Sequence, residues 1–180
     1  PWKPLALLWV DGIIAEPMNK RPIVITVIGG SNAVQKDLDV AYQVGLELAK
    51  RGAIVLCGGM TGVMEAVCKG AKDARGTTVG IMPGNNDEGA NDYVDIAIPT
   101  GLGSARNAIV ARAGGAIIAI DGAYGTLSEL GYGLGDGTPI VGLNTWQFMI
   151  DGKEDTTIER ADNALDAVEK ALTYAEARRT

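Results

Sequence analysis

The stretch AIIAIDGAYGTLSELGYGL, residues 116–134, runs an apolar segment directly into a glycine turn and then into a helical pattern. The apolar residues 116–120 predict a buried strand, and Gly122 and Gly125 predict a tight turn after it. If the helix begins near Tyr124, Glu129 faces back toward that turn, because helical side chains lean toward the N-terminus. The stretch therefore predicts a strand, a turn and a helix, with one carboxylate close to the turn.

Apolar strands alternate with helical patterns on both sides of this unit. The strands are continuous apolar runs, which favours a parallel sheet covered on both faces. The sequence thus predicts an α/β fold: a Rossmann-like three-layer sandwich with an open, mainly parallel sheet in a single domain over residues 23–180. The other expected strands are residues 23–30, 53–59, 77–82, 94–99 and 139–143, and the other expected helices are residues 37–51, 63–74, 105–114 and 161–178.

Length and charge limit the partners that the chain could have. Its 180 residues, 47% of them hydrophobic, fit one soluble domain with a sizeable core. A net charge of −6 argues against a nucleic-acid groove, which needs clustered Lys and Arg. The apolar run in residues 1–22 is too short to span a membrane. We therefore expect no nucleic-acid or membrane partner, and an N-terminal arm over residues 1–22 that packs on the domain or on a second subunit.

Reactive side chains are few. Cys57 and Cys68 are too few for a disulfide framework and match no zinc spacing, so we predict buried thiols in a reducing cytoplasm. The chain has no histidine, which removes the commonest general base, the Ser-His and Cys-His nucleophile systems and most transition-metal sites. Any catalysis must rest on carboxylates, Arg, Lys, Tyr or the backbone, and we expect neither a bound metal nor a cofactor.

Glycines gather where the expected strands end and helices begin, which is the edge of an open α/β sheet where ligands bind. A glycine lets the backbone approach a phosphate, and a helix start offers unpaired amides. Tight turns also use glycine without any ligand, but two such turns, GGMTGVM and GAYGT, favour an anion site. The residues predicted to bind a phosphate or nucleotide are Gly29, Gly30, Ser31, Gly58, Gly59, Met60, Thr61, Gly62, Gly101, Ser104, Asn107, Gly122, Ala123, Tyr124, Gly125 and Thr126.

Standard phosphate motifs are missing from the sequence. The turn GGSNAV after the first expected strand does not fit G-x-G-x-x-G, and no G-x-x-x-x-G-K-[ST] occurs in the chain. An NAD dehydrogenase and a P-loop NTPase are both disfavoured.

Two further residues lie at the same expected edge. Arg106 follows Ser104, which we expect to be the N-cap of its helix. A cation in a first turn is unfavourable unless an anion lies nearby. Asp121, at the end of its strand, is expected to contact a ribose or to cap the turn.

The segments GGMTGVM, GLGSARNAIVARA and DGAYGTLSE resemble the LOG-like superfamily, which includes the "lonely guy" phosphoribohydrolases that release the base from cytokinin nucleotides. The resemblance covers about residues 23–143. Arg106 matches the Arg of that family's R-K pair, and Glu129 matches the last residue of its P-G-G-x-G-T-x-x-E motif. Three positions depart from the family pattern: Asp121 replaces Pro, Ala123 replaces the second Gly, and Asn107 replaces the Lys.

The phrase PTGLGSAR and the chain length look closer to a DprA/Smf-related sub-branch that also contains molybdenum cofactor carrier proteins, which retain the Arg and the Glu. Two functions are therefore implied. One is hydrolysis of the N-glycosidic bond of a nucleoside 5′-monophosphate, with Glu129 stabilising charge on the ribose or activating water. The alternative is a non-catalytic carrier of molybdenum cofactor or another phosphorylated ligand.

In the hydrolase reading, the phosphate rests on the amides of Gly125 and Thr126, with Gly59 and Thr61 opposite. Arg106 stays protonated, so it orients the phosphate or the base rather than donating a proton. The proton donor for the leaving base stays open between Tyr124, Asp121 and water. The resemblance also implies a homodimer or homotetramer.

Overall fold

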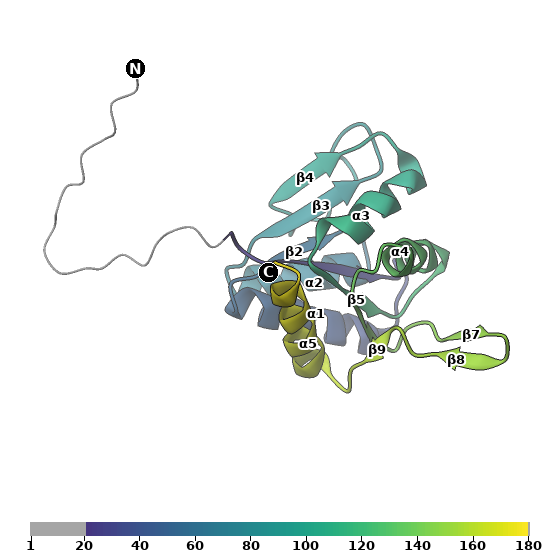
Figure 1. Ribbon diagram of the computed structural model, residues 1–180. Helices are drawn as coiled ribbons and strands as arrows, with labels where there is room; N and C mark the ends of the chain where they lie inside the picture. The colour runs from purple at the N-terminus through teal and green to yellow at the C-terminus, as the bar shows by residue number, and fades with distance from the viewer. Residues whose placement is uncertain (1–20, 180) are drawn as a thin grey trace, which may run out of the picture.

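The computed structural model describes residues 21–179, and a seven-stranded sheet forms its centre (Figure 1). The strand order is β4-β3-β2-β1-β5-β6-β9, and every neighbouring pair is parallel. The expected open parallel sheet is confirmed. The expected arm over residues 1–22 falls almost wholly outside the described residues. The strands are β1 (Val24–Gly29), β2 (Ile54–Cys57), β3 (Thr78–Met82), β4 (Ile96–Pro99), β5 (Ala116–Ile120), β6 (Ile140–Leu143) and β9 (Glu159–Arg160).

Helices cover both faces of this sheet (Figure 1). One face carries α1 (Gln35–Lys50), α2 (Val63–Asp73) and α5 (Ala164–Ala177), and the other carries α3 (Asn107–Ala113) and α4 (Tyr124–Gly135). None of the helices in the described part of the chain has the length and apolar composition of a membrane-spanning segment.

Alternate side chains of the central strands point to opposite faces of the sheet and pack in two separate cores. Val27 and Ile118 pack in the core under α1, α2 and α5, whereas Ile28 and Ile117 pack in the core under α3 and α4. All five residues of β5 are fully buried, because this strand is covered on both faces. Helices do not fully cover the edge strand β4, where Ile96 and Ile98 are 50% and 43% exposed.

Several local expectations need correction. Ser104 is not an N-cap: it lies inside a short 3-10 helix, η1 (Gly103–Arg106), and no side chain caps η1 or α3. The first helix begins at Gln35 rather than at residue 37. The antiparallel hairpin of β7 (Phe148–Ile150) and β8 (Lys153–Asp155) was not expected, and neither was β9. The hairpin extends away from the body of the domain (Figure 1).

The sheet order creates a switch point between β1 and β5. The chain proceeds from β1 through β2 and β3 to β4 on one side, and then returns to pair β5 with the other side of β1. The loops that follow β1 and β5 therefore leave their neighbouring strand ends in opposite directions. Such a divergence opens a crevice at the carboxyl edge of a parallel sheet.

The α1–α2 contact gives a first testable prediction. A Cβ placed on Gly45 would lie 2.0 Å from the carbonyl oxygen of Val67, so Gly45→Ala forces the two helices apart. We expect a loss of about 1–3 kcal/mol in the free energy of unfolding, measured by urea denaturation. The matched control is Gly131→Ala in α4, where an added Cβ meets no atom within 4 Å. That control should gain about 0.5–1 kcal/mol, and equal effects of the two substitutions would contradict the prediction.

Candidate functional site

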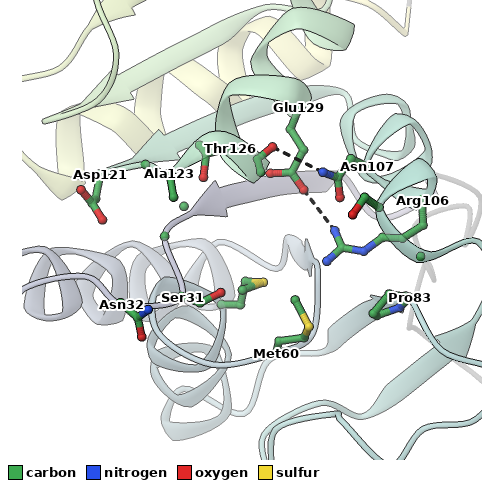
Figure 2. A pocket seen from close by; sticks show the side chains of 17 residues that line it. Ser31, Asn32, Met60, Pro83, Arg106, Asn107, Asp121, Ala123, Thr126 and Glu129 are labelled. Atoms are coloured by element: carbon green, nitrogen blue, oxygen red, sulfur yellow. Dashed lines mark hydrogen bonds and ion pairs between the residues drawn. The ribbon is translucent and has the colours of Figure 1, made fainter.

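A cavity of about 550 Å³ opens at the switch point (Figure 2). Its walls come from the loops after β1 and β5, the start of α4, and η1 with the start of α3. Met60 in the turn after β2, Met64 in α2 and Pro83 after β3 complete the lining. Parts of the chain that are up to 100 residues apart in sequence therefore meet at one edge of the sheet. The residues predicted from sequence that line it are Gly29, Gly30, Ser31, Met60, Ser104, Arg106, Asn107, Gly122, Ala123, Gly125, Thr126 and Glu129.

Arg106 and Glu129 form a buried ion pair in the wall of this cavity (Figure 2). Nη1 of Arg106 donates a hydrogen bond to Oε1 of Glu129 at 3.2 Å, and the two residues are only 5% and 6% exposed. Gly58 lies against the guanidinium, since a Cβ there would be 2.9 Å from both terminal nitrogens. The Nε–H group of Arg106 is buried and finds no hydrogen-bond partner among residues 21–179. Nη2 also makes no hydrogen bond with these residues and is not enclosed, so the guanidinium has a donor left for a molecule in the cavity.

Burial raises the pKa of Glu129 to about 7, against the opposing pull of the Arg106 charge. The desolvation of the carboxylate outweighs the attraction, so a proton binds to Glu129 near neutral pH. A carboxyl group that gains and loses a proton in this range can act in acid–base chemistry or change its hydrogen-bonding pattern.

The start of α4 offers amides to the same cavity. Ala123 is the N-cap residue, its backbone is extended, and no side chain caps the helix. The first-turn amides of a helix lack intrahelical partners and carry partial positive charge. Gly125 and Thr126 contribute such amides and line the cavity. The arrangement suits a small anion.

Asn107 stands where the pattern of the LOG-like superfamily has a Lys, and it links two helices by hydrogen bonds. Its Nδ2 donates to Oγ of Ser128 at 2.7 Å, and that hydroxyl donates to the carbonyl oxygen of Gly125 at 2.7 Å. Asn107 therefore holds α3 against the first turn of α4. Arg106 is left as the only cationic side chain among the described residues that line the cavity.

Six residues that the sequence pattern grouped with the site do not line the cavity: Gly58, Gly59, Thr61, Gly62, Gly101 and Tyr124. Gly62 has a φ of 69°, and a Cβ there would lie 2.4 Å from the carbonyl oxygen of Gly30. The next amide, of Val63, donates to that same oxygen at 3.0 Å. Gly62 and Val63 thus support the loop after β1 from behind, while Met60 and Met64 of the same segment line the cavity.

Tyr124 lies outside the cavity lining and is 82% exposed, with its ring 6.3 Å from that of Trp146. Asp121 lines the cavity and has a φ of 55°, which is unusual for a residue other than glycine. Its carboxylate makes no hydrogen bond with any residue in the described part of the chain, so it does not cap the turn.

Four lining residues were not predicted from the sequence: Asn32, Met64, Pro83 and Gly103. Asp121, for which ribose contact was one of two expectations, lines the cavity as well. Asn32 and Gly103 adjoin predicted residues, so their positions in the turns were a usable signal. Met64 and Pro83 gave none, because apolar residues at a strand end or in a helix are indistinguishable from core residues in the sequence.

The two cysteines are free and buried, with their sulfur atoms 3.5 Å apart, and neither lines the cavity. Across residues 21–179, no three His, Cys, Asp or Glu side chains are grouped in a way that could hold a metal ion.

Solved structures resemble this chain over nearly its whole length. The molybdenum cofactor binding protein of the phototrophic bacterium Rippkaea orientalis superposes with a TM-score of 0.75 at 33% identity, over 89% of this chain and 99% of that one. The Moco carrier protein of Chlamydomonas reinhardtii gives a TM-score of 0.75 at 33% identity, over 88% and 99%. DNA processing protein A of Streptococcus pneumoniae, at 15% identity and a TM-score of 0.63, shares the fold alone.

Comparisons of the sequence support the same relationship as the solved structures do. An uncharacterized protein of Archaeoglobus fulgidus is 40% identical over 119 residues, which are 66% of this chain and 78% of that one. The sequence model of the SLOG cluster4 family matches residues 22–174. The resemblance to the LOG-like superfamily and to its sub-branch near molybdenum cofactor carriers is confirmed, and the chain belongs to the SLOG cluster4 family.

Proposed function

We propose that this protein is a carrier that holds a phosphorylated pterin, of the molybdenum cofactor class, in the cavity at the switch point. The observation that carries the proposal is an uncapped helix start facing the same cavity as a buried arginine with an unused donor. The two molybdenum cofactor proteins that are 33% identical to this chain support the choice of ligand.

The dimensions and chemistry of the cavity suit such a ligand. About 550 Å³ is within the usual range for small-molecule sites. The phosphate lies at the first-turn amides of Gly125 and Thr126, and the ring system lies toward Arg106. The lining contains neither cysteine nor histidine, so this chain offers the metal of the cargo no thiolate or imidazole ligand. The organic part of the cargo therefore supplies the contacts that hold it.

A second candidate function, N-glycosidic hydrolysis of a nucleoside 5′-monophosphate, is favoured by one specific observation. Glu129 lines the cavity, and its pKa of about 7 suits a general acid or base. Two features weigh against it. The carboxylate is bound to Arg106. Apart from Glu129, the described lining offers as charged side chains only Arg106, whose guanidinium is a poor proton donor, and Asp121, which lies at the other end of the cavity.

The carrier and the hydrolase predict different experimental outcomes. Freshly released molybdenum cofactor, incubated with the protein and separated by gel filtration, should leave about one pterin per cavity bound to the chain. Incubation with AMP or GMP at high protein concentration should release no free base. Loss of all pterin on the column would contradict the carrier. Free adenine together with ribose 5-phosphate, absent from a Glu129→Gln variant, would establish the hydrolase instead.

Arg106 should control ligand affinity. Arg106→Gln removes the only cation of the described lining, so we expect retention of the pterin cofactor to weaken by about 10- to 100-fold, measured by equilibrium dialysis. The matched control is Arg112→Gln on the exposed side of α3, where Arg112 pairs with Asp136. This control should bind as the wild type does. Circular dichroism of both variants checks that the fold is intact, and equal binding by both would contradict the role of Arg106.

Glu129 should make stability depend on pH with a defined sign. Its pKa rises from an ordinary 4.5 to about 7 on folding, so its contribution is complete below pH 4.5 and is lost as pH rises through 7. This difference corresponds to about 3 kcal/mol. Urea unfolding of wild type and Glu129→Gln should give similar stabilities near pH 5. At pH 8 the variant should be the more stable by about 1–3 kcal/mol, and a difference that is constant with pH would contradict the assignment.

A further inference from the structure

The two ends of the cavity have different chemistry (Figure 2). Asp121, Asn32 and Ser31 lie at one end, next to the uncapped start of α4. Glu129 and Arg106 lie toward the other end, with Met60 and Pro83 across from them. A ligand whose phosphate is held by the α4 amides therefore extends its ring system toward Glu129 and Arg106.

The second end has the form of a slot for a flat ring. Met60, Met64 and Pro83 supply apolar walls. The sulfur of Met64 and the guanidinium of Arg106 lie side by side over Gly58, where an added Cβ would be 2.8 Å from that sulfur and 2.9 Å from the guanidinium. Methionine sulfur packs favourably against aromatic rings. A planar heterocycle in this slot would have its polar edge directed at the ion pair.

The ion pair presents an acceptor beside a donor, and neither is fully used. Glu129 receives one hydrogen bond from the described residues, although a carboxylate can accept about four. Nη2 of Arg106 makes no hydrogen bond with the described residues and, unlike Nε, is not enclosed by protein. Buried polar groups are normally satisfied, so both groups point to a ligand that supplies donors to Glu129 and an acceptor to Nη2 of Arg106.

We propose that Glu129 and Arg106 recognise the 2-amino-4-oxo edge that pterins share with guanine. This inference rests on the proposed function, because it takes a phosphorylated pterin as the ligand. The carboxylate of Glu129 accepts hydrogen bonds from the ring N–H and the exocyclic amine, and Arg106 donates to the neighbouring carbonyl. Adenine offers the opposite order on its edge, an amine where guanine has the carbonyl, and hypoxanthine lacks the 2-amino group. Glu129 and Arg106 are therefore specificity-determining residues in this protein.

Nucleotides that differ only in this edge test the inference. Isothermal titration of the wild-type chain with GMP, IMP and AMP should give affinities in that order. Loss of the 2-amino group removes a hydrogen bond to a charged acceptor, so GMP should bind about tenfold or more tightly than IMP. Glu129→Gln replaces one acceptor oxygen by a donor, and the GMP to IMP ratio should fall to about threefold or less.

A matched carboxylate-to-amide change at the other end of the cavity is Asp121→Asn. It alters the charge beside the phosphate for both nucleotides alike, so the GMP to IMP ratio should stay at the wild-type value even where both affinities change. A wild-type ratio near one, failure of GMP to bind, or an equal loss of the ratio in both variants would overturn the inference. Retention of molybdenum cofactor on gel filtration is a separate measurement, so a carrier that holds its pterin without this discrimination would refute the inference and leave the proposed function intact.

Discussion

The ion pair between Arg106 and Glu129 is the constraint around which this edge of the protein is organised. Desolvating both charges costs several kcal/mol per ion, and their attraction offsets this only with good alignment. Gly58 lies against the guanidinium, and α4 positions the carboxylate across the cavity. A pair that is costly to bury and incompletely hydrogen-bonded contributes little to stability.

The parallel sheet sets where this pair can meet a ligand. Because β5 pairs with β1 on the side opposite β2, the loops after β1 and β5 diverge, and the start of α4 faces the space between them. The loop after β1 is held in turn by Gly62 and the amide of Val63, both of which contact the carbonyl of Gly30. The glycine-rich segments after β1 and β5 line the cavity, whereas the segment after β2 both supports the loop after β1 through Gly62 and lines the cavity through Met60 and Met64.

The sequence predicted the fold well because its strands are long apolar runs separated by glycine turns, and both signals are local. Helix geometry placed Glu129 beside the turn after β5, and the resemblance to the LOG-like superfamily singled out both Arg106 and Glu129, although Ser104 is not the expected N-cap. The sequence could not separate Gly30, which lines the cavity, from Gly62, which lies behind it, because that difference depends on how two βα turns pack. The hairpin of β7 and β8 was missed although Asp151-Gly152, both with positive φ, form a two-residue turn of the kind typical of hairpins. Its strands have only three residues each, and β8 (Lys153–Asp155) is charged, so no second apolar run marked the pair.

Asn107, which stands where the LOG-like pattern has a Lys, limits the positive charge of the cavity. A Lys there would place a second cation beside Arg106, which could hold a phosphate and leave Glu129 free for chemistry at the sugar. In this chain Asn107 is committed to Ser128 and Gly125, so Arg106 alone supplies positive charge to the described lining. Glu129 then stays bound to it and shielded from water, and a carboxylate held in this way is suited to recognising a ligand's N–H groups.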